Sequence, residues 1–192
     1  MKKHFDLSRI LDHEEEEKLL LYLATKDIRD WIATLLGLRA GLRLAEILGL
    51  QVGDVLIGDD ITMELTLRKE ITKGHKVRDV PLCFEVRQGI KNILRAKRKK
   101  GESLQPEAPL FCNQKGNAPY GHRDFQRHLH AAGRNVLKRR LTVHDLRHSF
   151  ATRYARKGNL AALQHFLGHA SLETTGWYLH PNKQDLRDLV GP

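Results

Sequence analysis

The chain reads TVHDLRHSFAT at residues 142–152 and LGHASLETTGWYLH at residues 167–180. In the first stretch His144 and Arg147 are three residues apart, which places both side chains on one face of a helix. A guanidinium matches two oxygens of a phosphate, so an arginine beside an imidazole is a pair that suits a phosphate site. The second stretch adds a histidine after a glycine and, near its end, a tyrosine hydroxyl.

The first stretch also permits a second interpretation, a zinc site. His144 and His148 are four residues apart, the spacing of the zinc ligands in the His-Glu-x-x-His helix of metalloproteases. However, Asp145 replaces the longer glutamate that acts there as general base, and Arg147 would place a cation between the two ligands. We therefore favour the phosphate site, and we expect no metal and no cofactor.

A second arginine suited to an anion lies in GLRLAEILGL, residues 41–50. Arg43 stands among residues suited to burial, and a buried guanidinium needs an anionic partner to offset its desolvation. Glu46, three residues on, would supply one as an ordinary ion pair within a helix. A bound phosphate would supply another, and the spacing alone leaves both open.

The composition indicates a polyanionic partner. Of the 192 residues, 33 are lysine or arginine and 23 are acidic, a net charge of +10, with a pI near 9.8. Nucleic acid is the partner that such a charge favours. No apolar run approaches the ~20 residues of a spanning helix, and no signal peptide is apparent, so we expect a cytoplasmic protein without membrane segments. Cys83 and Cys112 are expected to be reduced structural thiols.

Apolar periodicity predicts a mainly α-helical single domain with a small antiparallel sheet. Asp12 and Glu15 are spaced as a capping box at the start of a helix that ends near Ala24. The run Glu14 to Glu17 within it is expected to be solvated. Further helices are expected at about 28–40, 42–49, 82–100, 121–137, 143–157, 160–167, 172–178 and 183–189.

Between residues 55 and 81 the period changes to two. Apolar residues alternate with polar ones at Ile61, Met63, Leu65 and Leu67. A glycine-containing turn at residues 72–75 and a second extended segment follow, so we expect an antiparallel hairpin. The loop 101–109, which holds two prolines, is the candidate hinge.

Together these motifs resemble those of the tyrosine recombinases, or phage integrase family. Catalytic domains of that family read Gly-x-Arg-x-x-Glu-Leu, then a hairpin lysine, then His-x-Leu-Arg-His, then Leu-Gly-His and finally a tyrosine. Here the motifs appear in that order, from about Leu11 to Leu189. The resemblance implies the α+β fold of that catalytic domain and a site-specific DNA recombinase that requires neither a metal nor ATP.

The resemblance also implies a nucleophile and a phosphate clamp. Tyr178 would attack the scissile phosphate to give a 3′-phosphotyrosyl enzyme and a free 5′-hydroxyl. Arg43 and Arg147 would bind the nonbridging oxygens, whose charge increases in the transition state. His169 would add a hydrogen bond to the same phosphate.

Proton transfer is assigned in the same way. Lys73 matches the hairpin lysine and would protonate the leaving 5′-oxygen, although Lys69 and Lys76 are close in sequence. His144 would assist proton transfer at the tyrosine. Glu46 matches an acidic position of the family and would orient the neighbouring arginine.

Many members of the family carry an additional N-terminal core-binding domain, whereas the matched motifs here begin near the first residue, so we expect residues 1–192 to form a single catalytic domain without that core-binding domain. The chain would then be either a truncated form or similar to the short recombinases of the fimbrial inversion type. Such a domain makes fewer phosphate contacts with double-stranded DNA and should bind it more weakly. Recombination would then need a homotetramer or an accessory DNA-bending protein. Arg123 and Arg127 are expected DNA contacts.

Two other functions stay open at this stage. A regulator of the same fold would bind DNA without cleaving it, but the complete set of site residues argues against that function. A type IB topoisomerase-like enzyme would share the chemistry without exchanging strands. Activity on unrelated supercoiled plasmids would favour the topoisomerase.

Overall fold

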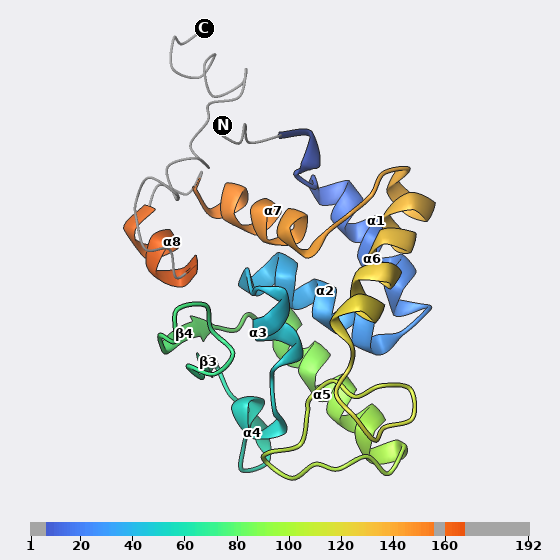
Figure 1. Ribbon diagram of the computed structural model, residues 1–192. Helices are drawn as coiled ribbons and strands as arrows, with labels where there is room; N and C mark the ends of the chain where they lie inside the picture. Colours follow the sequence, from blue (N-terminus) through green and yellow to red (C-terminus); the bar gives the residue numbers. More distant parts are fainter. Residues whose placement is uncertain (1–6, 156–159, 168–192) are drawn as a thin grey trace, which may run out of the picture.

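The computed structural model describes residues 7–155 and 160–167, and its helices pack around one central helix, α2 (Ile28–Ala40) (Figure 1). Every residue from Ile32 to Leu38 in α2 is buried, because helices cover it on several sides. These are α1 (His13–Ala24), α5 (Phe84–Lys99) and α7 (Val143–Ala155). The described structure also contains a short 3-10 helix (Leu7–Arg9), α6 (His122–Leu137) and α8 (Leu160–Leu167).

The ends of α1 and α2 confirm two predictions. Asp12 accepts a hydrogen bond from the backbone of Glu15 at 2.8 Å, and the Glu15 carboxylate accepts one from the backbone of Asp12 at 3.2 Å. This is the predicted capping box. Gly41 ends α2 with φ of 60°, and a Cβ there would lie 2.6 Å from the ring of Phe150 in α7. Glycine therefore serves both the left-handed backbone and the close approach of α7.

The prediction that all of Glu14 to Glu17 are solvated is wrong for Glu16. Its side chain is fully buried and pairs with Arg39 of α2 at 2.6 Å and with Arg153 of α7. Glu16 lies on the same face of α1 as Leu19, Leu20 and Leu23, which is the face that packs on the core. Burial of this carboxylate joins three helices through one ion-paired cluster.

The antiparallel hairpin is confirmed, as a pair of strands β3 (Glu64–Leu67) and β4 (Arg78–Pro81) with Leu65 opposite Val80. A second small sheet pairs β1 (Leu56–Ile57) with β2 (Asp60–Ile61). The alternation was expected to run through Met63, but its side chain is 72% exposed. The chain leaves β2 after Ile61 and begins β3 at Glu64, so Met63 lies between the two sheets.

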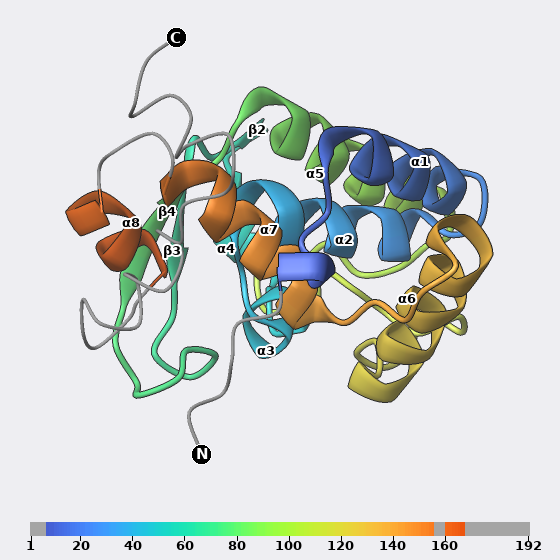
Figure 2. The ribbon, with the colours of Figure 1, turned by 90° about the horizontal axis from the view of Figure 1, so that it is seen from above.

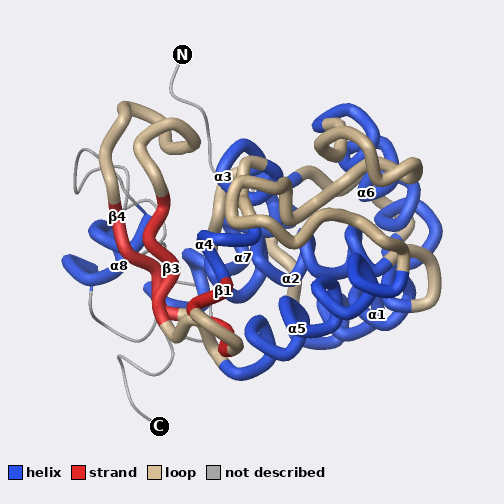
Figure 3. The backbone as a smooth tube through the Cα atoms, turned by 90° about the horizontal axis from the view of Figure 1, so that it is seen from below, coloured by secondary structure: helices blue, strands red, loops and turns tan. Residues whose placement is uncertain are grey.

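The hairpin and α8 lie side by side at one end of the described structure, and α1 and α6 lie at the other (Figures 2 and 3). Between them α3 (Leu44–Leu48) and a short α4 (Val52–Val55) lead from α2 to the sheets. The sequence predicted α3 but not α4. The expected helices at 121–137 and 160–167 are confirmed, and that at 143–157 is confirmed as far as Ala155. Those at 172–178 and 183–189 lie outside the described residues.

The loop expected to be a hinge is attached to the domain by backbone hydrogen bonds. Gly53 donates to the carbonyl of Pro106 at 2.8 Å, and Val52 donates to that of Ala108 at 2.9 Å. Leu110 donates in turn to Leu50 at 2.8 Å. These bonds fix the loop 101–109 against α4, which argues against a hinge there.

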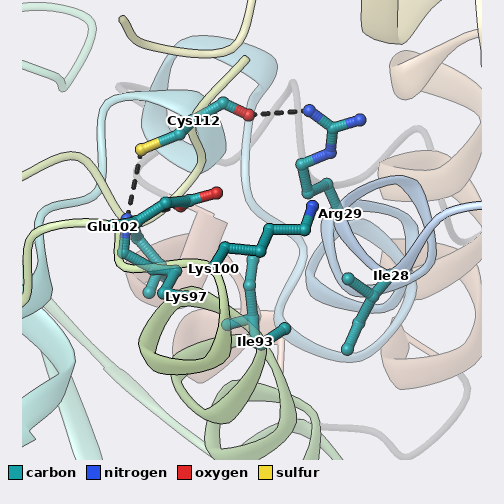
Figure 4. Close-up of a pocket in the computed structure, with 9 residues that line it drawn as sticks. Ile28, Arg29, Ile93, Lys97, Lys100, Glu102 and Cys112 are labelled. Atoms are coloured by element: carbon teal, nitrogen blue, oxygen red, sulfur yellow. Dashed lines mark hydrogen bonds and ion pairs between the residues drawn. The ribbon is translucent and has the colours of Figure 1, made fainter. Parts of the chain in front are cut away.

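A small pocket lies beside this loop, where α5 ends (Figure 4). Lys97, expected on the basic end of α5, is instead buried in it and donates to Glu102 and to the thiol of Cys112, both at 3.1 Å. Arg29 donates to the Cys112 carbonyl at 2.9 Å. Cys112 is buried and Cys83 exposed, and both are free thiols. The pocket therefore joins α2, α5 and the loop.

Among the described helices, none is both long enough and apolar enough to cross a membrane.

Candidate active site

Glu46 in α3 is the centre of a cluster of arginines. Its carboxylate is fully buried and accepts a hydrogen bond from the Arg43 side chain at 2.9 Å and from the Arg43 backbone N–H at 2.7 Å. Arg43 occupies the N-cap of α3, so the predicted ion pair is confirmed but closes the start of the helix rather than lying along it. The arginine is thereby held at a helix terminus, with 22% of its side chain exposed.

Arg78 is a third member of the cluster, and the sequence analysis missed it. It lies in β4, is only 7% exposed, and its Nη2 donates to Glu46 Oε2 at 2.7 Å. The signal was present in the alternation of Arg78 with Val80, which puts both side chains on the buried face of the hairpin. A buried arginine requires an anionic partner, and that requirement could have drawn attention to it.

Arg147 in α7 is 4% exposed and its guanidinium bridges two helix ends. Nη1 donates to the carbonyl of Gly41, just after α2, and Nη2 donates to that of Leu167, the last residue of α8, each at 2.5 Å. Helix carbonyls at these positions have no partner within their own helix. Arg147 thus satisfies both carbonyls and is locked in position by three helices.

The charges of the three arginines act together on Glu46. Burial alone would raise the pKa of Glu46, but the charges of Arg78, Arg43 and Arg147 and the hydrogen bond from the Arg43 backbone hold that pKa below its usual value. The carboxylate is therefore ionised at neutral pH. The structure brings together Arg43, Arg147 and Glu46, as the sequence predicted, and adds Arg78.

His144 and His148 lie on α7 with ring centroids 6.3 Å apart. His144 is only partly covered by the protein, and this partial burial, together with the charge of Arg147, lowers its pKa. Burial, helped by His144 and Arg147, lowers the pKa of His148 to about 4. Both imidazoles are thus neutral near pH 7, and a neutral His144 is able to accept a proton.

The lowered pKa of His148 predicts a pH-dependent loss of stability. In the unfolded chain its imidazole, with a pKa of about 6.5, binds a proton before the folded protein does. The free energy of unfolding should therefore fall as the pH drops from 6.5 towards 4. Between pH 7 and pH 5 the wild type should lose about 1–2 kcal/mol more than His148→Gln in urea titrations. Parallel pH curves for the two proteins would contradict the assignment.

Lys73 is exposed in the loop of the β3–β4 hairpin, as are Lys69 and Lys76. The loop makes the predicted glycine turn, with positive φ at Gly74 and His75. Arg68, the first residue of the loop after β3, is held by an ion pair with Asp54 at 2.7 Å. The hairpin that carries the lysines is attached to the Glu46 cluster through Arg78. Because all three lysines are exposed, their surroundings do not show which of them is the general acid.

Four further site residues were predicted, two for catalysis (His169 and Tyr178) and two for DNA contacts (Arg123 and Arg127). His169 and Tyr178 lie outside the described residues. Arg123 and Arg127 are exposed in the first turns of α6, and Arg127 pairs with Asp124 at 2.8 Å. Within residues 7–155 and 160–167, no group of three histidines, cysteines or carboxylates is placed to hold a metal ion.

Comparisons with known proteins agree with this arrangement. The model of the phage integrase family matches residues 9–185. The chain is 38% identical over 170 residues to tyrosine recombinase XerC of Methylobacterium nodulans, covering 81% of this chain and 50% of that protein. It is 33% identical to tyrosine recombinase XerC of Haemophilus influenzae, covering 98% of this chain and 62% of the relative. The chain thus spans about half to three fifths of these relatives.

Solved structures show the same fold. The XerA recombinase superposes with a TM-score of 0.77 at 25% identity, over 94% of this chain and 63% of that one. The XerH site-specific recombinase, in a pre-cleavage complex with its difH substrate, gives a TM-score of 0.72 at 29% identity, over 97% of this chain and 55% of that one. The fold is that of a tyrosine recombinase catalytic domain, and the chain belongs to the phage integrase family.

Proposed function

We propose that the protein is a site-specific DNA recombinase that cleaves and rejoins duplex DNA through a 3′-phosphotyrosyl intermediate. The observation that carries this proposal is the convergence of Arg43 and Arg147 beside one buried carboxylate. Two guanidiniums held beforehand by protein contacts suit the nonbridging oxygens of a phosphodiester. The relatives named above are recombinases by description, which supports the same activity here.

The resemblance to the tyrosine recombinases suggests how each step is assisted. Arg43 and Arg147 bind the scissile phosphate and stabilise the charge that builds on it as the Tyr178 hydroxyl attacks. Neutral His144 accepts the tyrosine proton, and His169 adds a hydrogen bond to the phosphate. Lys73 protonates the leaving 5′-oxygen. The phosphotyrosyl bond conserves the energy of the phosphodiester, so a 5′-hydroxyl can reverse the reaction without ATP.

We propose double-stranded DNA as the partner, bound by the chain as a single catalytic domain in the cytoplasm. The net charge of +10 and the description of XerH bound to its difH substrate support the choice of DNA. Strand exchange between two duplexes joins four cleaved strands, so a homotetramer is the assembly that we propose. An accessory DNA-bending protein is a further partner that we propose.

Arg123 is expected to contact the DNA backbone. Arg123→Gln should reduce the slope of log affinity against log salt by about 0.9, the value of one released phosphate counterion. Fluorescence anisotropy at several salt concentrations measures this slope. Arg98→Gln is the matched control, because Arg98 is exposed at the end of α5 farthest from the hairpin and should leave the slope unchanged. Equal slopes for Arg123→Gln and the wild type would remove Arg123 from the interface.

Strand exchange is the activity that tests the proposal. Covalent adducts formed on sheared DNA of the source organism are trapped with denaturant, and sequencing of their ends gives the cleavage site. Two labelled duplexes that carry this site should then yield recombinant products. Relaxation of unrelated supercoiled plasmids without exchange would indicate a topoisomerase, and reversible binding without cleavage would indicate a regulator.

A further inference from the structure

The Glu46 cluster contains three guanidiniums and one carboxylate in a buried setting. Glu46 is fully buried, while Arg78 and Arg147 are 7% and 4% exposed. Glu46 and Arg78 are 2.7 Å apart, and Glu46 and Arg43 are 2.9 Å apart. The formal charges of these four side chains sum to about +2 when all are ionised.

This sum balances the negative charge of the transition state in the reaction that we propose. A phosphodiester carries one negative charge, and attack by an oxygen nucleophile gives a pentacoordinate species with two negative charges on its nonbridging oxygens. A site that complements the transition state rather than the substrate should carry a positive charge equal to the negative charge of the transition state. Arg43, Arg147 and Glu46 alone sum to about +1, so Arg78 supplies the difference.

We propose that Arg78 is a positioning residue for DNA cleavage, one that shares Glu46 with Arg43 and keeps the site doubly positive. This inference rests on the proposed DNA cleavage. Without Arg78, the Glu46 carboxylate would pair more completely with Arg43 and weaken its pull on the developing charge. Glu46 holds Arg43 at the N-cap of α3, and Arg78 offsets the negative charge that this support introduces.

The test measures single-turnover cleavage of a synthetic duplex that carries the site recovered from trapped adducts. One version has an ordinary phosphodiester at the cleavage position, and the other has an uncharged methylphosphonate, whose transition state bears one negative charge fewer. Arg78→Met should slow cleavage of the phosphodiester about 30-fold or more, with DNA affinity unchanged, because the effect is confined to the transition state. On the methylphosphonate the loss should shrink to about threefold or less.

Control variants separate charge from architecture. Arg78→Lys keeps the charge and should stay within about fivefold of the wild type. Arg68→Met removes the other arginine at the loop end of the hairpin, whose ion pair is with Asp54, and should slow cleavage of both substrates equally if at all. A loss with Arg78→Met that is equal on both substrates, or no loss, would overturn the inference and leave the proposed function intact.

A second variant keeps the test decisive if Arg78→Met does not fold. Arg78→Met combined with Glu46→Gln leaves no unpaired carboxylate and restores the formal sum of about +2, so it should cleave within about tenfold of the wild type. A folded double variant whose cleavage is more than about 100-fold slower than that of the wild type would contradict the role of Arg78. A wild type that forms no adduct on any DNA would instead overturn the proposed function, and this inference with it.

Discussion

Replacing Arg147 by lysine is expected to slow DNA cleavage by about 10²–10³-fold, the usual effect of removing one fixed donor from a transition-state site. The guanidinium reaches the carbonyls of Gly41 and Leu167 together, each at 2.5 Å, and these contacts fix its orientation. A lysine keeps the charge but has one nitrogen, which cannot satisfy two carbonyls and a phosphate in that geometry. Single-turnover cleavage of the recovered site measures the loss.

Arg98→Lys is the matched control for Arg147→Lys, because Arg98 is exposed in the last turn of α5 and should tolerate the change. DNA affinity should fall far less than the cleavage rate, since the charge is retained. Cleavage within about threefold of the wild type for Arg147→Lys would mean that the planar guanidinium is not needed, and that its contacts with α2 and α8 only stabilise the fold.

Replacing Glu16 by glutamine should lower the free energy of unfolding by about 3 kcal/mol, near the lower end of the cost of breaking a buried ion pair. The Glu16 carboxylate is fully buried between Arg39 and Arg153, with its oxygen 2.6 Å from Arg39 Nη1. Glutamine leaves both guanidiniums without a counter-charge at this position. The cost is limited because Arg39 also pairs with Glu85, at 2.9 Å.

Glu14→Gln provides the comparison for Glu16→Gln in urea denaturation. Glu14 is 75% exposed and pairs with Lys18 within α1, and an ion pair in solvent contributes little to stability. The two variants remove the same charge from neighbouring positions of one helix. Equal effects of the two substitutions would show that the buried cluster contributes little to the cohesion of α1, α2 and α7.

The elements that the sequence predicted correctly are those governed by local rules. The capping box at Asp12 depends on two residues three apart, and the end of α2 depends on a glycine that adopts a left-handed backbone. The pairing of Arg43 with Glu46 was predicted for the same reason, because three residues separate them. The resemblance to the tyrosine recombinases, and not the spacing, implied that Arg43, Arg147 and Glu46 share one site.

The sequence could not show which side chains form ion pairs or hydrogen bonds with groups distant along the chain. Glu16 was expected in solvent because its neighbours are all acidic, and nothing local shows that Arg153 will meet it. Arg78 of β4 pairs with Glu46 of α3, 32 residues away in sequence, and Arg147 donates to carbonyls at the ends of two other helices. The alternation failed at Met63 for a local reason, because the Thr62 hydroxyl donates to the carbonyl of Glu64 at 2.7 Å and accepts from its backbone N–H at 3.2 Å, which makes a turn between β2 and β3.

The most direct test of the central claim is capture of covalent protein–DNA adducts from sheared DNA of the source organism, in EDTA, with wild type and Tyr178→Phe compared. The two side chains differ by one hydroxyl, so binding should be equal and only the nucleophile should be lost. We predict adducts with the wild type that resist denaturation, join the protein to a 3′-phosphate and are absent with Tyr178→Phe. Adducts that persist in Tyr178→Phe, or a wild type that binds DNA without ever forming one, would contradict the account.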